Sequence, residues 1–267
     1  SSRVGPSSSD SSSRVGPSSS SSSASLPSVR PEQIFVFIHQ VLVSAYTGWY
    51  PSSAIGLFVR CASLADKLRM EEVAYEFMAQ AFIAYEEYLE DPQGKPREIS
   101  LIIGALESFR GFSDGNWNTL VQRASQHAAK LRRKEDKATV IADCAHLYWP
   151  SALLAAPNCQ ESRRNDKKLL KCLQRALKAA NECINDQVEK FVMILNKYLF
   201  FFERRCPTIG VKYLQGLICL IEDHLKQLDD DQNGKRVRAY YANTIKYIKS
   251  KVLAMCESPH KHVSMCL

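Results

Sequence analysis

Apolar side chains recur at helical spacing through nearly the whole of residues 31–257. One stretch places them at i, i+1, i+4, i+7, i+8 and i+11: Leu169, Leu170, Leu173, Ala176, Leu177 and Ala180. The next stretch repeats the pattern with Ile184, Val188, Phe191, Val192, Leu195, Tyr198, Leu199 and Phe202. A period near 3.6 residues is typical of amphipathic α-helices, and no segment alternates as a half-buried strand does.

The breaks in this pattern predict ten helices. Gly48 to Pro51, Asp91 to Gly94 and Gly111 to Gly115 are short turn segments rich in glycine, proline or aspartate. The expected helices span 31–48, 51–68, 71–90, 96–111, 115–132, 135–149, 165–182, 184–205, 208–228 and 234–256. Helices with short connections pack antiparallel on their neighbours, and a long series of them forms a stacked array. The sequence therefore predicts an all-α protein, an α-solenoid without an obvious place for catalysis.

The two ends of the chain differ from this array. Residues 1–29 repeat Ser-Ser-Arg-Val-Gly-Pro and are mostly serine, so we expect them to be disordered. The solenoid should occupy residues 30–257, followed by a flexible tail at 258–267. The polar segment from Pro150 to Asn165 is the only long loop expected inside the array.

The charge and the cysteine content indicate which partners and which cellular compartment to expect. The net charge is +7, and part of the excess lies in the basic runs at 130–134 and 163–168. These runs favour solvated helix faces over nucleic-acid binding, because no stacking aromatic residues alternate with them. The nine cysteines are odd in number, and we expect five of them to be small buried side chains in helices: Cys61, Cys144, Cys172, Cys183 and Cys219. This usage indicates a reducing, cytoplasmic compartment.

Two segments resemble metal sites incompletely. Asp229, Asp231, Asn233 and Gly234 match the first half of an EF-hand loop, but its twelfth position is Tyr240 instead of glutamate. Zinc ligands are available in the tail at Cys256, His260, His262 and Cys266, with a spacing that is not familiar. No nucleotide-binding, serine-hydrolase or metalloprotease motif is present. We therefore expect no cofactor, no metal and no enzymatic activity.

The segment Cys144–Trp149 is the strongest candidate for a binding site. It ends a predicted helix just before the long loop. His146 and Trp149 are three residues apart and should share one strip of the helix surface. They could anchor an interface. Equally, Trp149 could only cover the core, while His146 satisfies the last carbonyl groups of the helix.

Four segments resemble, in order, the C-terminal half of the large retromer subunit, the vacuolar protein sorting-associated protein 35 family. They are Val73–Phe82, Leu101–Gly104, Cys144–Trp149 and Ile194–Tyr198, and the likeness covers roughly residues 30 to 230. The resemblance implies a solenoid of antiparallel HEAT-like hairpins that is non-catalytic. It implies a cytoplasmic scaffold, peripheral on endosomes, which returns membrane cargo to the Golgi or the plasma membrane.

The resemblance also implies partners. The matching half of these proteins binds the small subunit with a metallophosphoesterase fold, the vacuolar protein sorting-associated protein 29 family. The Pro-Arg-Leu-Tyr-Pro segment that binds the arrestin-like subunit is absent here. C-terminal halves can self-associate, and the endosomal membrane is reached only through other proteins. The residues expected to contact the small subunit are His146, Tyr148, Trp149, Asn196, Lys197 and Tyr198.

His146 is the first choice among these contacts. We expect it on the surface of the free chain, so that His146→Arg weakens binding while the fold survives. An alternative is an unrelated helical-repeat binding module of the proteasome-lid or nuclear-transport type. An all-helical enzyme is disfavoured, because the predicted core positions are apolar.

Overall fold

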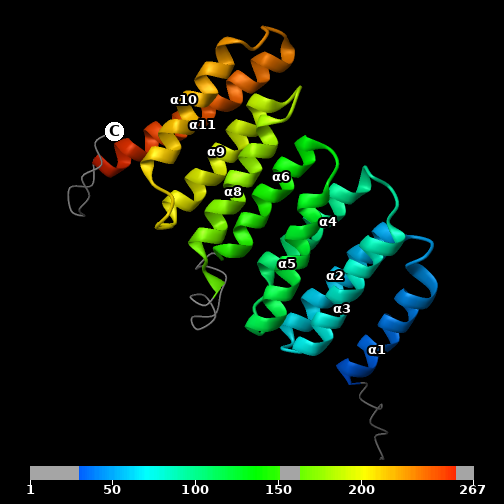
Figure 1. Ribbon diagram of the computed structural model, residues 1–267. Helices are drawn as coiled ribbons and strands as arrows, with labels where there is room; N and C mark the ends of the chain where they lie inside the picture. The colour runs from blue at the N-terminus through cyan, green and yellow to red at the C-terminus, as the bar shows by residue number, and fades with distance from the viewer. Residues whose placement is uncertain (1–29, 151–162, 257–267) are drawn as a thin grey trace, which may run out of the picture.

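The computed structural model describes residues 30–150 and 163–256, and this part of the chain is all-α, as predicted (Figure 1). The helices are α1 (Pro31–Val41), α2 (Pro51–Lys67), α3 (Glu71–Ile83), α4 (Gly94–Ser108), α5 (Asp114–Lys130), α6 (Lys134–Cys144), α8 (Asp166–Asn181), α9 (Gln187–Glu203), α10 (Val211–Lys226) and α11 (Gln232–Cys256). Three short turns extend helices α1, α3 and α6: the π-helical η1 (Leu42–Tyr46) and η2 (Ala84–Tyr88), and the 3₁₀-helical η3 (Ala145–Tyr148).

Local chemistry sets the helix boundaries close to those predicted. Pro31 and Pro51 occupy first-turn positions, where a missing N–H costs nothing. The Asn165 side chain accepts a hydrogen bond from the backbone N–H of Lys168 and so caps α8. Arg69 and Arg205, with φ of 61° and 54°, end α2 and α9 in the left-handed conformation that stops many helices. The largest boundary errors are three residues: α4 ends three residues earlier than expected, and α9 and α10 each begin three residues later.

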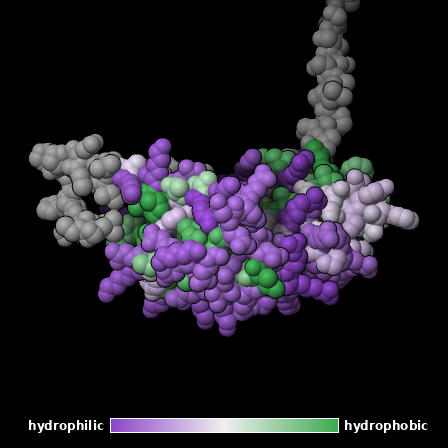
Figure 2. All heavy atoms as spheres, turned by 90° about the horizontal axis from the view of Figure 1, so that it is seen from above, coloured by the Kyte–Doolittle hydropathy of each residue, from purple (hydrophilic) through white to green (hydrophobic). Residues whose placement is uncertain are grey.

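The helices form five antiparallel hairpins that stack in two layers. The first layer consists of α2, α4, α6, α9 and α11, and each of these helices contacts the next one in the layer. The second layer consists of α1, α3, α5, α8 and α10. The contacts of α3, α5, α8 and α10 run mainly to the first layer, whereas α1 packs on Phe77 of α3. Closer spacing within the first layer makes it the inner side of a curved array, and the outline in Figure 2 is a shallow arc.

Small buried side chains allow the helices of both layers to pack closely. Alanines with no exposed surface occur in α2, in α6 and η3, and in α8: Ala54, Ala62, Ala65, Ala138, Ala142, Ala145, Ala176 and Ala180. Larger side chains fill the space between the layers, including Phe58, Phe77, Phe82, Phe191 and Phe201. These closely packed side chains stabilise the fold through many weak van der Waals contacts and through the burial of apolar surface.

Buried and half-buried polar groups tie the turns to the hairpins. The Asp66 carboxylate of α2 accepts hydrogen bonds from the backbone N–H groups of Arg110 (3.0 Å) and Gly111 (2.7 Å), in the turn before α5. Glu71 accepts bonds from Ser113 and Asn116. Glu86 binds Arg123 at 2.7 and 2.8 Å. These carboxylates of α3 and η2 therefore connect to α5 and to the turn before it.

The cysteine prediction is confirmed in part. Cys144, Cys172 and Cys183 are buried free thiols, and Cys61 is half-buried. Cys219 is exposed on α10, because it lies on the side of that helix opposite Leu214, Leu217 and Ile221. Among the helices of the described residues, none is long and apolar enough to cross a bilayer.

Candidate functional site

The inner layer presents one solvent-facing strip made by successive helices. In α4, α6 and α9 the strip lies opposite the buried side, and in α11 it lies beside the buried side. We define this inner strip by residues of α4, α6, η3, α9 and α11: Leu101, Gly104, Thr139, Asp143, His146, Met193, Lys197, Phe200, Tyr240 and Tyr247. It offers a partner both apolar and charged groups on the concave side of the array.

Lys197 stands at the centre of the inner strip. Its ammonium group lies 2.9 Å from the Asp143 carboxylate and 3.0 Å from Nε2 of His146. Lys197 and Asp143 side chains are 26% and 29% exposed, so a partner can reach both. Glu107 of α4 is near this group, and burial raises the pKa of its carboxyl group although Lys197 opposes the change. The cluster joins three helices of the inner layer at one point.

His146 is held tightly in this cluster. Its ring contacts Phe200 and Phe201 of α9, with ring centroids 4.7 and 4.9 Å apart. Burial, together with the charges of Lys197 and Arg204, lowers the pKa of His146 to about 3. The imidazole is therefore neutral at pH 7, and its Nε2 accepts a hydrogen bond from the Lys197 ammonium group. His146 is therefore only partly exposed, because Phe200 and Phe201 of α9 pack against its ring.

Asn196 lies beside Lys197 and points to the last helix. Its amide donates a hydrogen bond to the Tyr240 hydroxyl (2.9 Å) and accepts one from Thr244 (3.2 Å). Both partners belong to α11. Asn196 therefore fixes the contact between α9 and α11, and Tyr240 carries the surface that a partner would meet there.

Tyr148 and Trp149 lie apart from His146. The chain leaves helical geometry at Trp149, with φ of −147° and ψ of 69°, so the predicted shared strip does not form. Trp149 instead packs under the Arg164 guanidinium, 5.0 Å from its ring centroid. Tyr148 hydrogen-bonds Ser125 of α5 (3.1 Å) and lies 5.9 Å from the Lys168 ammonium. These residues belong to the second-layer side of the hairpin.

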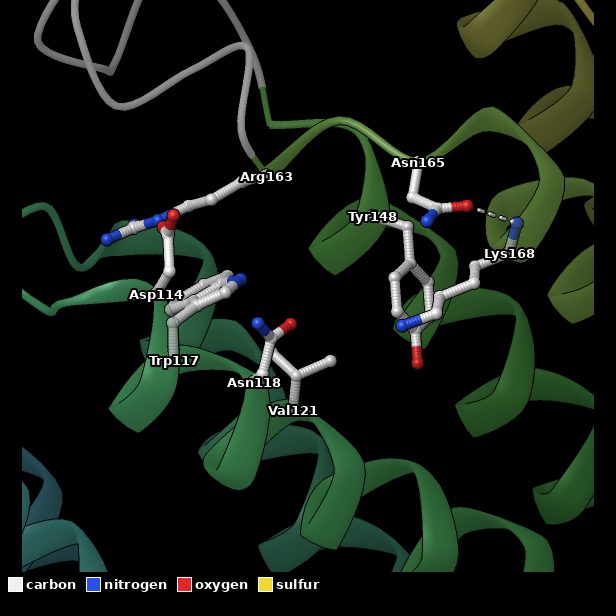
Figure 3. Close-up of a pocket in the computed structure, with 8 residues that line it drawn as sticks. All are labelled: Asp114, Trp117, Asn118, Val121, Tyr148, Arg163, Asn165 and Lys168. Carbon is white, nitrogen blue, oxygen red and sulfur yellow. Dashed lines mark hydrogen bonds between the residues drawn. The ribbon is translucent and has the colours of Figure 1, made fainter.

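Figure 3 shows the pocket to which Tyr148 contributes. The pocket has a volume of about 70 Å³, and its lining comes from the start of α5, from η3 and from the start of α8. Arg163 stacks on Trp117 (4.4 Å) and donates hydrogen bonds to the carbonyl groups of Phe109 and Phe112. Arg163 thus holds the turn before α5. This part of the former basic run is a structural contact.

Tyr198 belongs to the core. It is 1% exposed, and its ring stacks on that of Tyr213 in α10 at 5.9 Å. Its position in α9 faces the second layer, whereas Lys197 faces the inner strip. Of the six predicted contact residues, the structure brings together His146, Asn196 and Lys197 and separates the other three.

Comparison with known proteins decides the family. The family model described as Vacuolar protein sorting-associated protein 35 matches residues 12–224 of the chain. The chain belongs to this family.

Relatives from distant organisms share most of the chain. Vacuolar protein sorting-associated protein 35A of Arabidopsis thaliana is 33% identical over 231 residues, which is 83% of this chain and 28% of the relative. Vacuolar protein sorting-associated protein 35 of Schizosaccharomyces pombe is 32% identical over 178 residues, which is 65% of this chain and 21% of the relative. The Dictyostelium discoideum protein is 23% identical over 220 residues, 82% and 27% of the two chains. The chain therefore matches only 21% to 28% of the length of these relatives.

The segments whose sequence resembles the family mainly supply side chains to the hydrophobic core. Val73–Phe82 lies in α3 and supplies Phe77, Met78 and Phe82 to the core. Leu101–Gly104 lies in α4, where Leu101 and Gly104 reach the inner strip while Ile102 and Ile103 are buried. Sequence reasoning missed Asp143 and Phe200. The available signal was their spacing, since Asp143 is one turn before His146 and Phe200 is one turn after Lys197.

The candidate metal sites have other roles or lie outside the described residues. The Asp231 carboxylate accepts the Gly234 N–H and caps α11, and Arg238 bonds the Asp229 and Leu228 carbonyl oxygens. A guanidinium thus occupies the turn that resembled a calcium loop. The described part of the chain contains no cluster of three or more metal-binding side chains. His260, His262 and Cys266 of the tail lie beyond the described residues, and the side chain of Cys256 is not described.

Proposed function

We propose that this chain is a scaffold segment of retromer and that its inner strip binds the small subunit with the metallophosphoesterase fold. Family membership supports a role in protein sorting, and the two-layer solenoid supplies a concave side built from successive helices. The Lys197 cluster is the observation that carries the assignment of the face. It places a reachable cation and carboxylate beside the apolar surface of Phe200 and Met193. Interfaces of this kind combine apolar anchors with a polar rim.

In this role the chain binds and positions its partner and catalyses no reaction. The residues of the inner strip are held by neighbouring helices, so a partner meets a preformed surface and little ordering is needed on binding. The proposed setting is the cytoplasmic side of endosomes, where the chain is peripheral and other proteins supply membrane contact. Retrieval of cargo to the Golgi or the plasma membrane follows from that assembly.

Two glycines allow the face to be tested without disturbing the fold. A Cβ added at Gly104 in α4 or at Gly216 in α10 meets no atom within 4 Å. Gly104 lies on the inner strip, whereas Gly216 lies on the second layer. Gly104→Glu and Gly216→Glu therefore add the same side chain at equally open helical positions on opposite sides of the array.

Calorimetric titration of each variant with the purified small subunit tests the proposal. We expect Gly104→Glu to weaken binding by at least about tenfold, because the new side chain holds the surfaces apart and loses roughly 1.4 kcal/mol or more. Gly216→Glu should bind like the parent protein. Equal affinity of both variants would remove the inner strip as the contact face, and a parent chain that does not bind would remove the partner itself.

A further inference from the structure

The outer face of α8 carries a row of cations that no carboxylate interrupts. Between Asp166 and Glu182 this helix contains no aspartate or glutamate. At about 100° per residue, every third or fourth position returns to the same side of a helix, so the exposed cations of α8 share one face. We call these residues the α8 row: Lys167, Lys168, Lys171, Arg175 and Lys178.

The cations of the α8 row are unpaired. Elsewhere in the array, Arg123, Lys134 and Arg236 each lie against a carboxylate of a neighbouring helix or turn. Within residues 30–150 and 163–256, no member of the α8 row forms an ion pair. The neighbouring helix α5 contains no carboxylate after Asp114. The row therefore produces a positive potential that attracts anions.

A polar pocket lies at one end of the row. Lys168 lines it together with Asn118 of α5 and Asn165, and the three side chains extend into the same space (Figure 3). The Nε–H group of Arg163, another lining residue, is buried and has no acceptor in the described part of the chain. The Asp114 carboxylate lies beside the Arg163 guanidinium (Figure 3), so Lys168 is the charge in excess. The pocket therefore offers N–H groups and a net positive charge to an anion.

The size of the pocket matches a phosphate group. One water molecule needs about 10–15 Å³ of such volume, so a pocket of about 70 Å³ holds roughly five non-hydrogen atoms. A phosphate group has five, the phosphorus and four oxygens, and ammonium and other N–H groups are its usual donors. Lys171 and Arg175 follow Lys168 within about 60° around α8 and about 10 Å along it. Further phosphates of the same molecule can therefore contact the row.

The composition of this surface favours a small ligand over a macromolecule. Protein-binding surfaces have apolar or aromatic side chains at their centre, whereas every exposed side chain of α8 is polar. Single-stranded nucleic acids need aromatic rings on which bases stack. Here the Trp117 ring is buried under Arg163, and the Lys168 ammonium lies over Tyr148. A compact molecule that carries several phosphates fits these properties.

We propose that the α8 row and this pocket bind a multiply phosphorylated inositol, with one phosphate in the pocket and others on Lys171 and Arg175. The same phosphorylated ring occurs in free inositol polyphosphates and in the headgroups of phosphoinositide lipids. The site belongs to the second layer, on the side opposite the inner strip, so it is independent of small-subunit binding. The ligand neutralises the row and joins α5 to α8, and it should stabilise the folded chain as any ligand specific for the native state does.

Calorimetric titration of the chain with inositol hexakisphosphate tests the proposal. We expect Lys168→Gln combined with Lys171→Gln to weaken binding by about tenfold or more, because two charge-assisted contacts are lost. Lys246→Gln combined with Lys249→Gln is the matched control. It removes the same two charges, at the same spacing, from exposed positions of α11. The control variant should bind like the parent protein.

A second pair of variants tests the pocket itself. Asn118→Asp and Gln126→Glu each add one negative charge to exposed positions of α5, but only Asn118 lines the pocket. Asn118→Asp should weaken binding by at least about threefold, because its carboxylate repels the phosphate at close range. Gln126→Glu should have a smaller effect. An Asn118→Asp protein that binds like the parent would exclude the pocket and overturn the proposal.

Vesicles distinguish the two sources of the ligand. Cosedimentation with phosphatidylcholine vesicles that contain a phosphatidylinositol bisphosphate, lost in the Lys168 and Lys171 double variant, would assign the lipid headgroup. A chain that binds the soluble compound and stays in solution with these vesicles would assign the free ligand, and both results support the proposal. Absence of binding by the parent protein, or equal losses in the two double variants, would overturn it. Tighter binding of a glutamate-rich peptide than of inositol hexakisphosphate would point to an acidic protein segment and overturn it too.

Discussion

Replacement of Asp66 by alanine should destabilise the protein more than any single surface change. The carboxylate is 6% exposed and bonds two backbone N–H groups, those of Arg110 and Gly111. A hydrogen bond to a charged group contributes about 1.5–3 kcal/mol, and a buried donor without a partner costs about 1–3 kcal/mol. Allowing for water that enters the space left by the side chain, we expect Asp66→Ala to cost about 3 kcal/mol.

Urea denaturation followed by circular dichroism measures this loss. Asp66→Asn keeps one acceptor oxygen and should fall between the parent and Asp66→Ala. Asp223→Ala is the control, because its pair with Lys226 is fully exposed and its removal should leave the midpoint unchanged. An Asp66→Ala protein within about 1 kcal/mol of the parent would refute the reasoning, since that cost fits an ordinary surface change.

The remaining predictions concern pH and the core. The pKa of His146 is lowered to about 3 in the folded protein, so the imidazole of the unfolded chain binds a proton at higher pH than the folded one does. The contribution of neutral His146 to the free energy of unfolding is therefore fully present above pH 6.5 and is lost as the pH falls toward 3. At pH 5 the loss of stability should be roughly 2 kcal/mol. The urea midpoint should therefore drop less between pH 7 and pH 5 in His146→Gln than in the parent protein. Equal drops in the two proteins would contradict this. Phe58→Ala empties a fully buried site between α2 and α3 and should cost about 3–5 kcal/mol in the same denaturation experiment; a smaller cost than that of Tyr88→Ala, at a half-exposed site, would contradict the described core.

The sequence predicted the fold well because the helices are amphipathic and their ends carry strong local signals. The first-turn prolines and the Asp91 turn belong to single short segments, so no distant contact was needed to find them. The exact ends of α3 and α6 were not predictable. Their last turns change to π- and 3₁₀-geometry where they pack against other hairpins.

The candidate site was predicted less well, because it depends on which side of a helix each residue takes. His146 and Lys197 are 51 residues apart, and only the stacking of α6 on α9 brings their side chains to 3.0 Å. Tyr198 differs from Lys197 by one position, yet one residue turns a helix by about 100° and carries it into the core. The exit of the chain from helical geometry at Trp149 could not be seen in the sequence.

Contacts limited to neighbouring hairpins also determine how the molecule opens. In such an array each hairpin is stabilised only by those beside it, so local unfolding begins at the ends and its free energy rises toward the middle. α11 touches little besides α9, whereas α6 contacts helices on both sides. Amide hydrogens of α11 should therefore exchange with solvent earlier than those of α6, and a partner seated on the inner strip would slow exchange in helices that it never touches.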